Sequence, residues 1–235
     1  MPRARRAAST GGARLGALSL ALVVLLAGCA GRPRPAQPAT YVVRAGDTLY
    51  SISWRHGLDY RDVARWNGIG ADYRIDVGQV LALAPNAHPA APPAATAAAV
   101  ARPRSPAPLP VTPAPHWSWP ADGTVDGAVE KPSGGVGLRI AGTLGSPVRA
   151  AAAGRVVYTG AGLRAYGELV IIKHDDTWLT AYGYNQQLLV HEGEAVREGQ
   201  PIAAMGTGPG RQAALYFEIR MNGRPVDPRT QLPPR

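Results

Sequence analysis

The pattern of hydrophobic and polar residues divides the chain into three regions. In two of them the residues alternate as they do in folded segments, and in the region between them they do not. Across residues 40–85, short apolar runs follow one another at strand and helix spacing. From residue 116 to 235, many short apolar segments are separated by Gly, Asn and Asp, which is typical of an all-β sheet or sandwich. Residues 86–115 keep no amphipathic period. We therefore expect two folded domains and a linker.

In the first region the pattern predicts the order strand, helix, helix, strand. Tyr41 and Val43 alternate with polar positions, as in a short strand. Asp47 is placed to cap the first helix, and Asp59 is placed to cap a second helix that ends at Asn67-Gly68. The result is a small α+β module with a βααβ order.

This module resembles a LysM domain. The matching residues are Tyr41, Val43, Gly46-Asp47-Thr48-Leu49, Ile52, Asn67, Ile69, Ile75 and Gly78-Gln79. LysM domains bind glycans that contain N-acetylglucosamine, such as peptidoglycan, in a shallow groove between the loop before the first helix and the loop after the second. The resemblance implies glycan contacts at Gly46, Asp47, Thr48, Leu49, Asn67, Gly68 and Ile69. Most of these residues also have a structural role to fill.

The N-terminal residues read as an export signal. Arginines precede the apolar run Leu15–Leu26, which is too short to span a bilayer comfortably. The run ends in Leu26-Ala27-Gly28-Cys29, which resembles a bacterial lipobox and holds the only cysteine. The resemblance implies cleavage after residue 28, a lipid anchor on Cys29 and a tether over 29–39, and Ala30 in place of Asp favours the outer membrane. The alternative is a free thiol at the end of a signal anchor.

The formal net charge of +9 overstates what the mature chain would carry, because four arginines lie in the signal segment. The remaining net charge of +5 is not concentrated in a dense basic helix, so we expect no nucleic-acid partner. The linker over 86–115 is rich in Pro and Ala, which favours a disordered, semi-rigid spacer. At ~3.1 Å per residue, some thirty residues would reach on the order of 90 Å and present the last domain at a distance. A proline-recognition ligand is the alternative reading.

Residues 116–235 resemble the mainly-β lysostaphin-like (LytM) zinc peptidases. The matching segments are 154–160, 166–174, 181–182, 198–206 and 215–220. Active members hold zinc with the His and Asp of a His-x-x-x-Asp element and the second His of a His-x-His element. The first His of His-x-His and the His of a Tyr-x-His element are catalytic. These five positions fall here on Gly135 and Arg139, on Tyr184, and on Ala214 and Tyr216. Every ligand is replaced, so we expect no zinc, no other cofactor and no catalysis.

The histidines that remain in this domain do not rebuild such a site. His174 and His191 fall on turns between strands, where a satisfied or solvated role is expected. The segment His191-Glu192-Gly193-Glu194 also lacks the second histidine of a His-Glu-x-x-His helix.

The order of lipobox, LysM module, proline-rich spacer and degenerate LytM domain is similar to that of NlpD-type lipoproteins. That family implies a non-catalytic activator of a periplasmic N-acetylmuramoyl-L-alanine amidase in cell separation, which displaces an inhibitory segment of the amidase. The expected partner-binding trough consists of Gly135, Arg139, Tyr184, Ala214, Tyr216 and Glu218. Two other readings stay open: a wall-binding scaffold with an inert last domain, and a hydrolase with unconventional residues.

Overall fold

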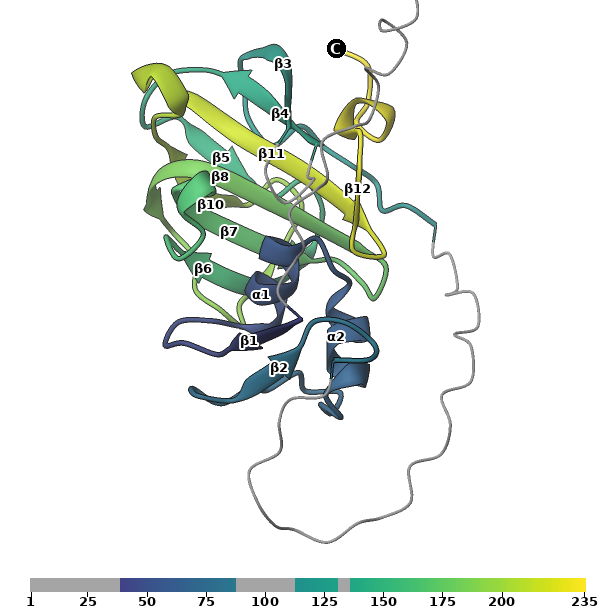
Figure 1. The fold of residues 1–235 in the computed structure, drawn as a ribbon. Helices are drawn as coiled ribbons and strands as arrows, with labels where there is room; N and C mark the ends of the chain where they lie inside the picture. Colours follow the sequence, from purple (N-terminus) through teal and green to yellow (C-terminus); the bar gives the residue numbers. More distant parts are fainter. Residues whose placement is uncertain (1–38, 88–112, 131–135) are drawn as a thin grey trace, which may run out of the picture. The chain divides into compact units, whose positions relative to one another are not determined.

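The computed structural model describes residues 39–87, 113–130 and 136–235 (Figure 1). Cys29, the apolar run before it, Gly135 and most of the proline-rich linker lie outside these ranges. Among the described residues, no helix has the length and apolar character needed to cross a membrane.

The first folded part has the predicted strand, helix, helix, strand order. Its elements are β1 (Thr40–Val42), α1 (Leu49–His56), α2 (Tyr60–Trp66) and β2 (Val80–Ala82). The two strands pair antiparallel. Apolar residues from both helices and both ends of the sheet form one core: Val43, Leu49, Ile52, Val63, Ala64, Leu81 and Leu83.

Helix α1 begins one residue later than the sequence predicted. Thr48 is its N-cap: the Thr48 hydroxyl accepts from the Ser51 amide at 3.1 Å, and the Ser51 hydroxyl accepts from the Thr48 amide at 3.0 Å. This reciprocal capping box satisfies two free amides at once. The Asp47 carboxylate is then available to accept from the Tyr41 hydroxyl at 2.7 Å, so its predicted capping role was wrong. The predicted cap at Asp59 is confirmed.

The second folded part is mainly β, as predicted. Over residues 113–130 and 136–235 its strands are β3 (Thr124–Glu130), β4 (Val136–Ala141), β5 (Pro147–Arg149), β6 (Gly154–Gly160), β7 (Glu168–Lys173), β8 (Trp178–Leu188), β9 (Ala195–Val196), β10 (Pro201–Met205), β11 (Ala214–Met221) and β12 (Arg224–Val226). The main path of the sheet is β3-β4-β11-β8-β7-β6-β9. Short 3₁₀ turns are η1 (Arg164–Tyr166), η2 (Pro209–Arg211) and η3 (Pro228–Thr230).

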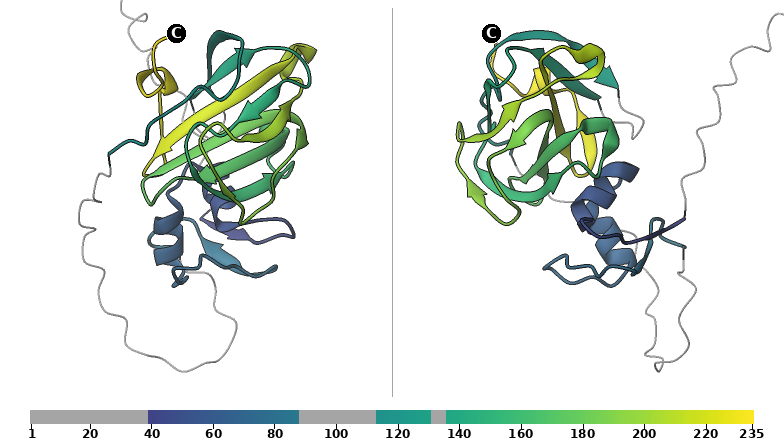
Figure 2. Two further views of the ribbon diagram at one scale, coloured as in Figure 1. Left: turned by 180° about the vertical axis from the view of Figure 1, so that it is seen from behind. Right: turned by 90° about the vertical axis from the view of Figure 1, so that its left-hand side faces the viewer.

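Strand β11 lies in the middle of this twisted sheet, between β4 and β8 (Figures 1 and 2). Its alternate residues Leu215, Phe217 and Ile219 enter the larger hydrophobic core. Tyr216 faces the other way and belongs to a second apolar cluster. Every residue from the start of β11 to Arg220 is buried. Both faces of this strand are therefore covered.

Part of that cover comes from the LysM part of the chain. Trp54 of α1 packs in the same cluster as Tyr216. Its ring centroid lies 3.7 Å from the guanidinium carbon of Arg220, and its carbonyl accepts from Arg220 Nη1 at 3.1 Å. Gly223 has φ of 71°, and a Cβ there would lie 2.6 Å from the Cα of Asp59. The linker was expected to hold the domains apart, whereas a second apolar face of α1 brings them into contact.

Candidate functional site

The positions that correspond to the zinc site of active peptidases lie together on three adjacent strands. Tyr216 on β11 is in register with Arg139 on β4 and with Gly183 on β8. The next residue of β8, Tyr184, places its ring centroid 5.8 Å from that of Tyr216. Ala214 is two residues before Tyr216 on the same strand. The sequence frame thus brings these four residues together, and Gly135 lies outside the described residues.

Tyr184 reaches this face through an irregularity in β8. Residues two apart on a regular strand share a face, yet Tyr182 packs in the larger core and Tyr184 in the opposite cluster. The register of β8 shifts against both β7 and β10 at this point, and Tyr184 has φ of 67°. Left-handed backbone at a bulky residue costs on the order of 1–3 kcal/mol and is concentrated at functional sites, as bulges are.

Aromatic rings fill the space around Tyr216. The ring of Tyr166 lies 5.3 Å from it, centroid to centroid, in an edge-to-face arrangement. On the other side the chain approaches so closely that a Cβ on Gly137 would lie 2.5 Å from the Tyr216 ring. Tyr216 is 0% exposed, and this burial, with the nearby Glu218 carboxylate, raises the pKa of its phenol far above the usual range. The trough expected from the sequence is closed at this position.

A chain of polar contacts runs from this phenol to the LysM helix. The Tyr216 hydroxyl donates to Glu218 Oε2 at 2.5 Å, and Arg220 Nε donates to Glu218 Oε1 at 2.6 Å. Arg220 then donates to the carbonyl of Trp54. Both members of the Glu218–Arg220 ion pair are buried. Glu218 was expected to contact a partner protein, but it is an internal counter-ion, because it is 0% exposed and Tyr216 and Arg220 occupy its two carboxylate oxygens.

Arg139 and Tyr184 remain at the edge of the site. The Arg139 side chain is 28% exposed and forms an ion pair with Asp126, whose side chain is 43% exposed. Tyr184 is largely buried, and that burial raises its pKa more than the neighbouring Arg139 lowers it. Arg139 puts a guanidinium at the accessible end of the site, and the buried Tyr184 puts a neutral phenol near it.

This set of side chains does not fit a zinc ion. A guanidinium repels a cation, the methyl group of Ala214 has no donor atom, and the phenols of Tyr184 and Tyr216 have raised pKa values and stay protonated. Within the part of the chain that the structure describes, no group of three or more His, Cys, Asp or Glu side chains could hold a metal.

His174 has the satisfied structural role that the sequence predicted. Its Nδ1 lies 2.7 Å from the Ala153 carbonyl oxygen and its Nε2 lies 2.8 Å from the Thr180 hydroxyl. Its ring also meets the ring of Trp117 edge to face. Burial lowers the pKa of His174 to about 4, so the imidazole is neutral in the folded chain.

The predicted glycan-binding residues fall into two groups in the LysM part. Gly46 and Gly68 are exposed in the two loops, and Asp47, Thr48 and Ile69 are half-buried there. Leu49 is 0% exposed in the core of the module, so it cannot touch a glycan and that prediction was wrong.

Asn67 joins helix α2 to strand β2. Its amide nitrogen donates to the carbonyls of Val63 and Ala82, at 2.7 and 2.9 Å, and its oxygen accepts from the Ala82 amide at 2.7 Å. A side chain with these bonds has little capacity left for a ligand.

Sequence reasoning missed the residues that cover the site. Tyr166 and Trp54 supply rings, and Arg220 supplies the charge that balances Glu218. One signal was present: Tyr50 and Trp54 are four residues apart, so they share a face of α1 away from its own core. A short helix with apolar residues on two faces indicates a second packing partner.

Comparison with known proteins identifies both domains and relatives along most of the chain. Residues 41–83 match the LysM domain, and residues 133–228 match Peptidase family M23. The chain is 43% identical to "Lipoprotein NlpD/LppB homolog" of Pseudomonas aeruginosa, over 88% of this chain and 81% of that protein. It is 37% identical to "Uncharacterized lipoprotein YgeR" of Escherichia coli, over 92% of this chain and 91% of that protein.

A third relative has a name that states an activity. The chain is 34% identical to "Murein hydrolase activator NlpD" of Salmonella typhimurium, over 84% of this chain and 69% of that protein. With a LysM module, an M23 fold without its metal ligands, and relatives of this kind along most of its length, the chain belongs to the NlpD family of lipoproteins.

Proposed function

We propose that the chain is a non-catalytic activator of a periplasmic zinc amidase that cleaves the N-acetylmuramoyl-L-alanine bond of peptidoglycan. The observation that carries this proposal lies within an intact M23 sheet. Arg139 and Tyr216 replace zinc ligands there, and Tyr184 and Ala214 replace catalytic histidines. A fold that keeps its strands and loses its donors is suited to binding a protein. The names of the relatives support the same reading.

The accessible end of the site is where we place the partner. Arg139 is already paired with a carboxylate, Asp126, that is itself partly exposed, so an acidic side chain of the amidase can take that place at small cost. Tyr184 offers an apolar ring beside it. Tyr216, whose hydroxyl donates to Glu218, packs against Tyr184. The activator can shift the amidase only by its difference in affinity for the open and closed amidase states.

The N-terminal lipid and the LysM module would determine where in the cell envelope this domain acts. A lipid on Cys29 would hold the protein at the outer membrane, and the LysM module would hold it at peptidoglycan, which raises the local concentration at the wall during cell separation. A Cys29→Ala protein should therefore still activate amidase in solution and should lose its place at the division site, as fluorescence microscopy of a tagged protein would report.

The direct experiment is release of dye-labelled peptidoglycan by a cognate amidase in the presence of the purified chain. We expect Arg139→Ala and Tyr184→Ala each to lower the stimulation at least tenfold, and we expect Arg197→Ala, an exposed arginine on a loop elsewhere in the sheet domain, to leave it unchanged. Far-UV circular dichroism confirms that each variant is folded.

Each alternative gives a different result in the same assay. A wall-binding scaffold leaves the amidase rate unchanged by the wild-type chain. A hydrolase releases dye without any amidase and stops when a chelator is added. Full stimulation by both the Arg139→Ala and Tyr184→Ala proteins would show that the amidase does not bind at this end of the site.

A further inference from the structure

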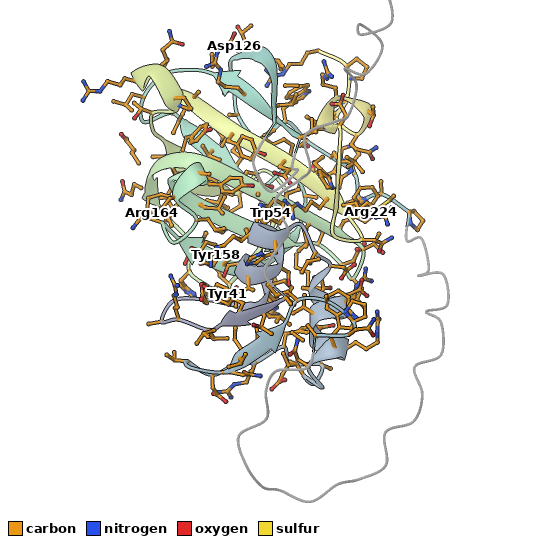
Figure 3. The ribbon with its side chains drawn as sticks, viewed as in Figure 1. Tyr41, Trp54, Asp126, Tyr158, Arg164 and Arg224 are labelled. Atoms are coloured by element: carbon orange, nitrogen blue, oxygen red, sulfur yellow. The ribbon has the colours of Figure 1, made fainter. Side chains whose placement is uncertain are left out.

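A cavity of about 770 Å³ lies where the LysM loop that opens α1 meets the loop between β6 and β7. Its volume is within the ~300–1,000 Å³ range of small-molecule and cofactor sites. From the LysM part it is lined by Tyr41, Arg44 and Arg55. From the sheet domain it is lined by Tyr158 and Arg164, which, with Tyr41, are labelled in Figure 3.

The charge of this cavity favours an anion. Its lining holds three arginines and one carboxylate, that of Asp47. Arg55 shares that carboxylate with the Tyr41 hydroxyl, at 3.3 and 2.7 Å. Arg44 and Arg164 are exposed, and neither takes part in the ion pairs of residues 39–87, 113–130 and 136–235. Two guanidiniums thus remain for a ligand.

A second observation points to a missing polar partner. His56 also lines the cavity, and its buried Nε2 atom has no hydrogen-bond partner among the described residues. A buried ring nitrogen without a partner costs about 1–3 kcal/mol, so a ligand with hydroxyl or amide groups would relieve it. The residues that line the cavity therefore include arginine guanidiniums, tyrosine rings and His56, whose Nε2 atom has no hydrogen-bond partner among the described residues.

The two walls of the cavity are held in place by packing outside it. Arg61 of α2 donates to the side-chain oxygen of Asn222 at 2.7 Å, and the close approach of Gly223 to Asp59 lies next to this contact. Trp54 and Arg220 add the cation–π contact described above. A site built from two domains but fixed by contacts of this kind is formed before its ligand arrives, which lowers the entropy lost on binding.

We propose that this cavity binds a carboxylate carried by an N-acetylated glycan of peptidoglycan, next to the sugars that the LysM loop takes. Gly46 and Asp47 belong both to the cavity and to the predicted glycan loop, so one glycan strand can reach both. The inference rests on the proposed function for its ligand. When water cleaves the N-acetylmuramoyl-L-alanine amide, the acyl carbon keeps the new hydroxyl and becomes a free lactyl carboxylate on the glycan, while the peptide leaves with a free amine.

The same chemistry also exists in the stem peptide, whose carboxylates hang from uncleaved glycan. Both sources carry an anion within a few bonds of an N-acetylated sugar. Recognition of the lactyl form would keep the activator on glycan from which peptides have just been removed.

Calorimetric titration of the full chain with three probes separates these sources. The probes are a neutral chito-oligosaccharide, peptide-free peptidoglycan glycan of the same length, and a disaccharide with its stem peptide. We expect the peptide-free glycan to bind at least tenfold more tightly than the neutral one. Arg44→Gln and Arg164→Gln should each remove about tenfold of that preference and leave binding of the neutral probe unchanged. Arg197→Gln, an exposed arginine that lies outside both the cavity and the LysM loops, is the matched control.

The outcomes are distinct. Equal affinity for neutral and anionic glycan overturns the proposal, as does a loss of neutral-probe binding in both variants. An effect of Arg44→Gln without one of Arg164→Gln would restrict the site to the LysM part and overturn the shared cavity. Tighter binding of the stem-peptide probe than of peptide-free glycan assigns the carboxylate to the peptide. No amidase is present, so failure of the activator function in the dye-release assay leaves these readings intact.

Discussion

The buried ion pair between Glu218 and Arg220 gives a sharp test of how the sheet domain and the LysM part are joined. An Arg220→Met protein keeps most of the side-chain length and removes the charge. Glu218 then stays fully buried with only the Tyr216 hydroxyl as a partner, and Trp54 loses both its cation and the donor to its carbonyl. Glu218→Gln removes the other charge and leaves the Arg220 guanidinium uncompensated.

The magnitude follows from the burial of the pair. Removing one partner of a buried ion pair costs about 3–5 kcal/mol, because the other charge is left desolvated. At roughly 2–4 °C per kcal/mol for a chain of this size, either single variant should lower the melting temperature by on the order of 6–20 °C. Replacing both partners leaves no buried charge. The Glu218→Gln/Arg220→Met protein should therefore recover most of the loss.

The assay is thermal and urea unfolding of the wild type, the two single variants and the double variant, followed by circular dichroism. The double-mutant cycle should give an interaction free energy of at least ~2 kcal/mol for residues in direct contact in one network. Arg229→Met, which removes an exposed ion pair with Asp227, is the control and should leave the melting temperature nearly unchanged. Additive effects in the double variant would refute the reasoning that the pair is a coupled buried unit.

Three further perturbations test other contacts. Gly137→Ala should lower stability by about 1–3 kcal/mol through overlap with the Tyr216 ring, and a Tyr216→Leu background should relieve it in the same unfolding assay. His174, whose folded pKa lies near 4 and below its ordinary 6.5, contributes stability that is present above pH 6.5. That stability should fall by up to ~1.4 kcal/mol per pH unit down to about pH 4 and then level off, and a His174→Gln protein should lack this slope. Gly223→Val should separate the LysM part from the sheet domain, because its side chain meets Asp59; small-angle X-ray scattering should then report a larger radius of gyration, and an unchanged radius would contradict the contact.

Local features of the sequence were sufficient to predict the main helices and strands and the position of the degenerate site. The spacing of Tyr41, Asp59 and Asn67 marks short elements whose caps and turns are set by neighbouring residues. The frame around Tyr216 works because a strand register fixes which residues lie opposite one another, so Arg139 had to meet it, whereas Tyr184 reaches it through the irregularity in β8.

The state of that site could not be predicted because it depends on residues far apart in the chain. Glu218 looks like an available carboxylate until Arg220 is known to be buried with it, and Tyr216 looks exposed until Tyr166 closes over it. The positive φ of Tyr184 is likewise set by pairing with two other strands. The packing of Trp54 against the sheet domain likewise depends on residues far from it in the chain.

The close approach of Gly223 to Asp59 has a consequence for orientation. A LysM module bound to a glycan strand has a fixed angle to that strand, and a domain packed against the module has a fixed angle to the strand as well. The glycan strand then sets the orientation of the sheet domain, whereas a domain on a flexible linker would sample many orientations. Under the proposed function, the accessible face at Arg139 would then meet an amidase from the same side of the glycan.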